Sequence, residues 1–190
     1  MKKVIINALF FAAIAGSLSL TSCRENKEND NELAPPMQNE MHQDTVTGEN
    51  EDMVDPSPEF TDEGTAQVYN AYAEIKDALV KTDASGAQDA AENLVSLLEE
   101  NPEEPGLLEP ARKIAETEDV NQQREAFSAL TAAMQPVLEG ALASGEIYKQ
   151  YCPMAFEGKG DYWFSSSEQI RNPYFGDIML KCGRVEQTLN

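Results

Sequence analysis

Apolar residues recur at every third or fourth position through the middle of the chain, and this spacing restricts the fold more than any other feature. The clearest stretch, within residues 120–141, contains the series Phe127, Leu130, Met134, Val137 and Ala141. This period gives a helix one continuous apolar face. Weaker versions occupy residues 68–79, 87–98 and 111–115. Four amphipathic helices with short connections predict a mainly α protein, with an up-down four-helix bundle over residues 60–144.

Prolines interrupt two of these stretches. Three prolines between residues 102 and 110 predict an irregular corner before the short helix around Ala111. Pro136 lies inside the last stretch, so we expect a kink near Ala132 or Ala133, or an early end of that helix.

Residues 1–22 have the order of a secretory signal, in which Lys2 and Lys3 precede a short apolar run and small residues. Leu20–Cys23 resembles the lipobox of bacterial lipoproteins, which implies cleavage before Cys23 and lipidation of that cysteine. An ordinary signal with a chance cysteine is the alternative. The residue after Cys23 is Arg24, and not the aspartate that resembles an inner-membrane retention signal. We therefore expect an outer-membrane lipoprotein of the cell envelope, on either the periplasmic or the surface face.

Residues 23–59 contain 11 acidic residues and almost no large apolar ones. Such a segment cannot bury enough apolar surface to fold, so we predict a disordered acidic tether. Four of its side chains are possible copper ligands, and an ordinary flexible tail is favoured over a metal site there. These four are Met37, Met41, His42 and Met53.

Charge and residue types exclude several functions. The chain has 34 acidic and 14 basic residues and a formal net charge of −20, which disfavours binding to nucleic acids. Its single histidine, His42, lies in the predicted tether, and no glycine-rich phosphate loop occurs. Cys152 as a redox thiol lacks a nearby histidine or a second cysteine in a Cys-x-x-Cys motif. We therefore expect that the protein is not an enzyme.

Residues 145–190 are rich in aromatic residues and turn signals. They predict a small lobe of short strands or irregular structure, packed on the helices so that residues 60–190 form one domain. The lobe contains two sulfur pairs, Cys152 with Met154 and Met179 with Cys182. Two thiols and two thioethers form a soft donor set, which selects Cu(I) or Ag(I). Zinc is a weaker candidate because thioether is not among its usual ligands.

A disulfide between Cys152 and Cys182 is the competing interpretation, because a secreted protein meets an oxidising compartment. Closing a loop of roughly 30 residues stabilises a fold by about 3 to 4 kcal/mol on the chain-entropy model. Met154 and Met179 would then fill the core. Spacing alone favours the disulfide slightly, and both states can exist at different redox potentials.

Several motifs together resemble a bacterial family of domains of unknown function, which occurs on lipoproteins and at the ends of copper and silver efflux adaptor proteins. They are Tyr151–Ala155, Gly158–Gly160, Tyr162–Trp163, Ile170–Gly176 and Met179–Gly183. Residues 123–130 look like the last helix of that family, and the resemblance spans residues 60–190. Relatives often have histidines where this chain has Ala126 and Tyr151. A metal site that uses those imidazoles is therefore excluded in this chain, whereas a site made only of sulfur ligands is not.

The resemblance implies a link to copper or silver handling. We therefore predict a lipid-anchored protein that binds Cu(I) or Ag(I) through Cys152, Met154, Met179 and Cys182. It would sequester the ion or deliver it to an efflux adaptor. The alternative is a disulfide-stapled protein-interaction module of the cell envelope with no metal role.

Overall fold

The computed structural model describes residues 57–100 and 105–190. The predicted signal (1–22), the lipidation site Cys23 and nearly all of the predicted tether lie outside these residues. The possible tether ligands Met37, Met41, His42 and Met53 also lie outside them.

The first helix, α1 (Glu63–Val80), begins and ends with local hydrogen bonds that its sequence provides. The carboxylate of Asp62 accepts the backbone N–H of Thr65 at 2.7 Å, which pairs one of the free donors of the first turn. At the other end, the N–H of Asp83 donates to the carbonyl of Ala78 at 2.9 Å. This bond closes the helix because Thr82 takes a left-handed conformation with φ 57°.

The second and fourth helices follow the predicted apolar faces. α2 (Ala84–Glu100) buries residues of the 87–98 stretch. α4 (Val120–Leu138) begins at Asp119, whose carboxylate accepts the N–H of Asn121 at 2.8 Å. The helix ends two residues after Pro136, before the apolar pattern does at Ala141. Ala141 instead accepts the backbone N–H of Thr61 at 2.9 Å and begins the link to the strands.

The third helix, α3, corrects the expected corner. It runs from Pro105 to Ala115 and contains Pro110, so residues 105–110 are helical where an irregular corner was expected. Proline is favoured at the first position of a helix because its missing N–H would have no partner there. Burial of Leu107 and Ile114 against the other helices holds the remaining turns.

Two small antiparallel sheets complete the fold. β1 (Glu59–Phe60) pairs with β2 (Leu142–Ser144). The larger sheet has the order β4-β3-β5, with β3 (Ile147–Cys152) between β4 (Asp161–Ser165) and β5 (Arg184–Leu189). Its connections contain the short helix α5 (Ala155–Gly158) and the 3-10 turn η1 (Gly176–Ile178). The fold is mainly α.

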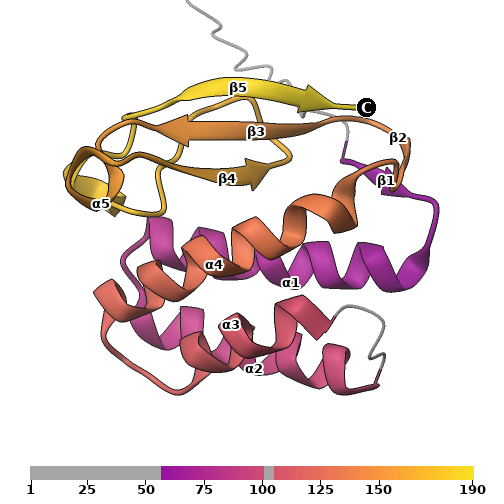
Figure 1. Ribbon diagram of the computed structural model, residues 1–190, viewed down its shortest axis with the longest axis horizontal. Coiled ribbons are helices and arrows are strands. Elements are labelled where there is room, and N and C mark those ends of the chain that lie inside the picture. Colours follow the sequence, from indigo (N-terminus) through magenta and orange to yellow (C-terminus); the bar gives the residue numbers. More distant parts are fainter. Residues whose placement is uncertain (1–56, 101–104) are drawn as a thin grey trace, which may run out of the picture. The chain divides into compact units, whose positions relative to one another are not determined.

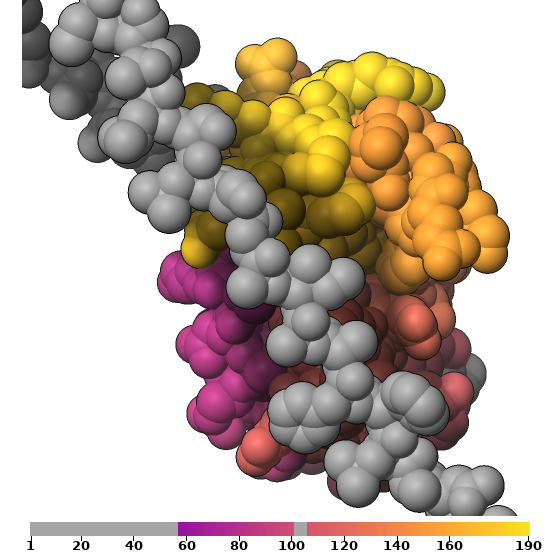
Figure 2. Space-filling view, turned by 90° about the vertical axis from the view of Figure 1, so that its left-hand side faces the viewer, coloured from indigo at the N-terminus to yellow at the C-terminus, as the bar shows by residue number. Residues whose placement is uncertain are grey.

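The sheet, α1 and α4 share a core. Figure 1 shows α1 and α4 between the three-stranded sheet and the pair α2 and α3, and Figure 2 shows the C-terminal lobe, in orange and yellow, above the helices. The buried Tyr72 of α1 links the layers, since its hydroxyl lies 2.9 Å from Oγ1 of Thr131 and accepts the N–H of Phe164 at 3.1 Å. The lobe is thus joined to the helices by buried hydrogen bonds as well as apolar contacts.

Within the described residues, no helix combines the length and the apolar character needed to cross a membrane.

Candidate metal centre

The sheet and one turn bring the two cysteines of the lobe together. Cys152 is the last residue of the central strand β3, and its side chain is fully buried. Cys182 is half-buried in the turn between η1 and β5, where its N–H donates to the carbonyl of Met179 at 3.0 Å. The turn delivers Cys182 to the end of β3, although 30 positions separate the two cysteines in the chain.

The sulfur atoms of Cys152 and Cys182 lie 3.3 Å apart, and both cysteines are free thiols. The pKa of the Cys182 thiol is raised, first by its hydrogen bond with Cys152 and then by burial and by the charge of Cys152. A backbone hydrogen bond from Met154 opposes this shift. Proton loss is therefore coupled to any chemistry of the pair, because a metal ion or an oxidant must displace thiol protons.

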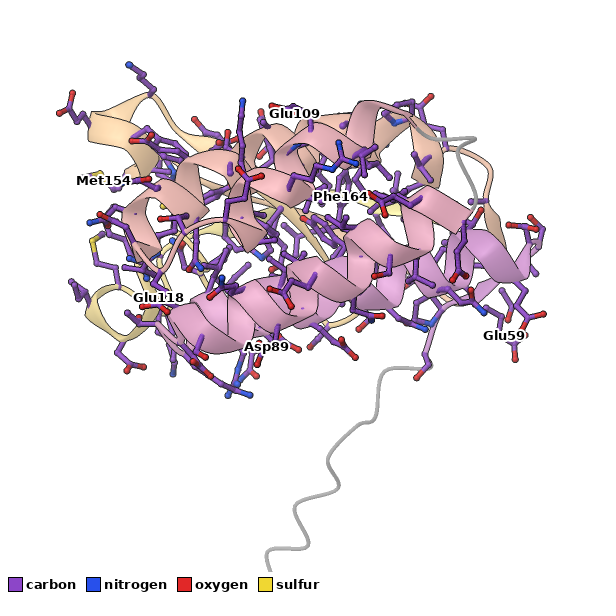
Figure 3. The ribbon with its side chains drawn as sticks, turned by 90° about the horizontal axis from the view of Figure 1, so that it is seen from below. Glu59, Asp89, Glu109, Glu118, Met154 and Phe164 are labelled. Atoms are coloured by element: carbon purple, nitrogen blue, oxygen red, sulfur yellow. The ribbon has the colours of Figure 1, made fainter. Side chains whose placement is uncertain are left out.

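The two predicted methionine ligands flank the pair through their backbones. Met154 contacts Cys182 through its backbone N–H, and Met179 contacts it through its carbonyl. Met154 is 51% exposed and lies at the outer edge of the molecule in Figure 3. Neither thioether makes a hydrogen bond with a cysteine sulfur within the part of the chain that the structure describes. The structure thus joins the two thiols directly, and the two thioethers only through neighbouring backbone.

Asn172 holds the turn that carries Cys182, and sequence reasoning missed this role. The buried side-chain amide donates through Nδ2 to the carbonyl of Cys182 at 2.8 Å, and the Asn172 backbone N–H donates to Leu180 at 2.9 Å. Its Oδ1 accepts the N–H of Tyr174 at 2.8 Å. An Asn-Pro pair by itself indicates only a turn. The bonds to residues 180 and 182 depend on tertiary contacts.

Gly183 allows the chain to turn directly behind the second cysteine. A Cβ at this position would lie 2.9 Å from Cη2 of Trp163 and 3.0 Å from the carbonyl oxygen of Tyr151, and the φ of Gly183 is +152°. Only glycine fits this close approach without moving the sheet. The contact seats the turn of Cys182 against β3 and β4.

Charged and aromatic side chains line the outer face of the sheet beside the pair. The rings of Tyr151 and Tyr162 are 4.7 Å apart between centroids. The guanidinium carbon of Arg184 lies 4.9 Å from the Tyr151 ring centroid, and its Nε pairs with Glu186 at 2.9 Å. The positive charge of Arg184 therefore lies against the ring of Tyr151, the residue before Cys152. The same guanidinium also pairs with the exposed carboxylate of Glu186.

Among residues 57–100 and 105–190, no group of three or more histidine, cysteine, aspartate or glutamate side chains could hold a metal ion. Zinc usually takes three or four protein ligands from this set. Among the described residues, the two thiols of Cys152 and Cys182 are therefore without a third ligand of this set.

Comparison with protein-family models gives a match for the helices. The family model described as "Protein of unknown function (DUF3347)" matches residues 68–144, which run from α1 to β2. The expected resemblance to a domain of unknown function is confirmed for these residues. The cysteines and the other motifs of the lobe lie beyond the match. No curated protein and no solved structure matches the chain. Residues 68–144, the helical part of the chain, thus match the family of proteins of unknown function DUF3347.

Proposed function

We propose that this protein binds a soft monovalent metal ion, Cu(I) or Ag(I), through Cys152, Cys182 and the thioethers of Met154 and Met179. The 3.3 Å contact between two free thiols is the observation that carries the proposal. Two thiolates with thioether neighbours form a soft donor set, and soft donors select Cu(I) over hard cations. One monovalent ion bound to two thiolates leaves about one net negative charge, which the nearby Arg184 and Lys181 offset in part.

Binding requires a small opening of the pair. At a metal–thiolate distance of about 2.3 Å, two sulfurs on one ion lie about 3.8 Å apart at a tetrahedral angle and about 4.6 Å apart on a line. The sulfurs therefore separate by about 0.5 to 1.3 Å from their 3.3 Å contact. The movement falls on Cys182, because its turn is half-exposed whereas Cys152 is fully buried in the central strand.

The exposure of Met154 suits transfer of the ion to another protein. Because Met154 is half-exposed, its thioether is within reach of a partner's ligand, whereas Cys152 stays fully buried. We propose sequestration, or delivery to an efflux adaptor protein, as the purpose of binding. We also propose that a lipid on Cys23 anchors the chain to the outer membrane, and that the four helices form an up-down bundle.

The decisive experiment is a Cu(I) titration against a coloured competing chelator under reducing conditions. Cys23→Ser serves as the background, because only Cys152 and Cys182 then remain as thiols. We expect one Cu(I) per chain, with uptake lost in Cys152→Ser and weakened in Met154→Leu. Met134→Leu is the matched control, because Met134 is fully buried in the helical core. Unchanged uptake in Cys152→Ser, with helical content retained, would overturn the proposal.

The same contact supports a second candidate function. Thiol–disulfide exchange with an oxidised dithiol protein of the cell envelope would take two electrons and two protons from the thiols and form a disulfide across 30 positions of the chain. This bond stabilises the fold by about 3 to 4 kcal/mol on the chain-entropy model. Ile178 in the adjoining turn is 83% exposed, which suits contact with another protein. In this alternative the lobe is a disulfide-stapled interaction module of the cell envelope, and added copper changes nothing.

A further inference from the structure

A cavity of about 220 Å³ lies between the beginning of α4 and the lobe, and neither Cys152 nor Cys182 lines it. Charged side chains, an aromatic wall and the polar side chain of Asn121 line it. The charged groups are Arg124, Glu125 and Glu157, and the aromatic ones are Phe156, Tyr174 and Phe175. In Figure 1, α5, which carries Phe156 and Glu157, lies close to the first turns of α4.

Arg124 is a buried cation with hydrogen-bonding capacity left over. The residue is 8% exposed. Its Nε donates to the carbonyl of Pro173 at 2.9 Å, and its Nη2 donates to Leu79 at 3.4 Å and to Oγ1 of Thr82 at 3.2 Å. Within the described residues, Nη1 of Arg124 has no acceptor, and no carboxylate forms an ion pair with the guanidinium. Nη1 is not fully buried, so a ligand can reach it. The cavity therefore borders a guanidinium with free donors.

Burial strengthens the demand for a counter-ion at this position. Desolvation lowers the pKa of Arg124, because the charged form loses hydration. The carbonyl of Leu79, in the last turn of α1, offsets part of the charge. An anion in the cavity would supply the rest through a charge-assisted hydrogen bond, which is the strong kind.

Backbone strain surrounds the same cavity. Thr82, Phe156 and Glu157 are the non-glycine residues with positive φ in the part of the chain that the structure describes, at 57°, 48° and 60°. Thr82 binds Arg124, and the other two line the cavity. Non-glycine residues disfavour a backbone with positive φ, so the surrounding structure must hold these three residues in it. Backbone strain of this kind is common at ligand sites.

The other lining groups define the ligand. Phe156 and Tyr174 meet edge to face at 5.2 Å between ring centroids and form an apolar wall. Glu125 and Glu157 are exposed and negative, so they repel phosphates and other polyanions and attract an ammonium group. A carboxylate for Arg124, an ammonium for the glutamates and an apolar body for the rings are the three parts of an amino acid.

We propose that this cavity binds a small zwitterion, namely a free α-amino acid with an aromatic or large apolar side chain. The carboxylate accepts from Arg124, the ammonium lies near Glu157, and the side chain packs on Phe156 and Tyr174. The proposal is independent of metal binding, because none of these residues is a sulfur ligand.

The test is calorimetric titration of the full chain with L-phenylalanine in the presence of EDTA, which removes any copper that the amino acid would chelate. Fluorescence of Trp163, the single tryptophan, gives a second readout because its ring lies 6.1 Å from that of Tyr174. We expect a Kd of about 0.1 to 1 mM, typical of a ligand of roughly a dozen heavy atoms. Phenethylamine, which lacks the carboxylate, should not bind, and 3-phenylpropanoate, which lacks the ammonium, should bind more weakly.

Two variants locate the site. Glu157→Gln should weaken L-phenylalanine about twofold to fivefold, the effect of an exposed charge pair, and leave 3-phenylpropanoate unchanged. Arg124→Lys should weaken both about tenfold; if it does not fold, the exposed Glu157 variant still decides. Glu92→Gln, on the outer surface of α2, is the control. No binding of L-phenylalanine at millimolar concentration, or equal binding of phenethylamine, would overturn the proposal.

Discussion

Asn172 and Cys182 are joined by a 2.8 Å hydrogen bond from the side-chain amide of the buried asparagine to the carbonyl oxygen of the cysteine. The second thiol of the candidate centre is therefore positioned by a residue ten places earlier in the chain. The bond ties the geometry of the thiol pair to the stability of the loop before η1.

Replacement of Asn172 by alanine should lower the free energy of unfolding by about 2 to 4 kcal/mol, because the Cys182 carbonyl and the Tyr174 N–H each lose a buried partner. Denaturant unfolding followed by circular dichroism measures the change. The matched control is Asn93→Ala on the exposed side of α2, which should stay within about 0.5 kcal/mol of the native value. Equal effects of the two substitutions would show that Asn172 does not hold the turn.

Replacement of Tyr72 by phenylalanine tests the link between helices and sheet. The change leaves the buried N–H of Phe164 without its acceptor and removes the bond to Thr131. We expect a loss of about 1 to 3 kcal/mol in unfolding free energy. Tyr151→Phe is the control, because Tyr151 lies half-buried on the outer face of the sheet. A smaller loss for Tyr72 than for Tyr151 would contradict this account.

The N-cap of α1 predicts a pH dependence. Hydrogen bonds from the backbone N–H and then the hydroxyl of Thr65 hold the pKa of Asp62 below its ordinary value of 3.8. A depressed carboxyl pKa stabilises the fold above the unfolded value, and this contribution is lost as pH falls through the lower, folded value. Asp62→Asn should therefore lower the Tm at neutral pH, and the difference should shrink below about pH 3.8. Melting curves of this variant and of the exposed Asp89→Asn across the acid range check it; identical pH profiles would refute the role of the cap.

The two thiols should react with iodoacetamide in a fixed order. Cys182 is half-exposed whereas Cys152 is fully buried, so Cys182 should be modified first even though its raised pKa slows it. Peptide mass mapping over time in the Cys23→Ser background gives the order. Modification of Cys152 before Cys182 would contradict the assignment of Cys152 as the buried thiol.

The helices could be predicted because their apolar spacing is local information. The faces that contain Leu79, Leu94 and Phe127 are buried as the period of three and four indicates. The extent of α3 could not be predicted, since Pro110 is a helix breaker by itself and only tertiary burial of its neighbours holds the helix through it.

The candidate site was predictable in its residue types but not in its geometry. The spacing of Cys152 and Cys182 indicated a pair, and the structure brings the two sulfurs into contact. The roles of Asn172 and Arg124 depend on bonds to residues 10 and 49 positions away. No periodicity or motif encodes such contacts, so they appear only once the lobe is folded against α4.

The most direct test of the central claim is the intact mass of the Cys23→Ser chain before and after Cu(I) is added under reducing conditions, combined with a count of alkylated thiols. Metal binding by the 3.3 Å pair predicts one copper per chain and protection of both remaining thiols. A chain that gains no copper, and whose two thiols are alkylated as fast with Cu(I) as without it, would contradict the account.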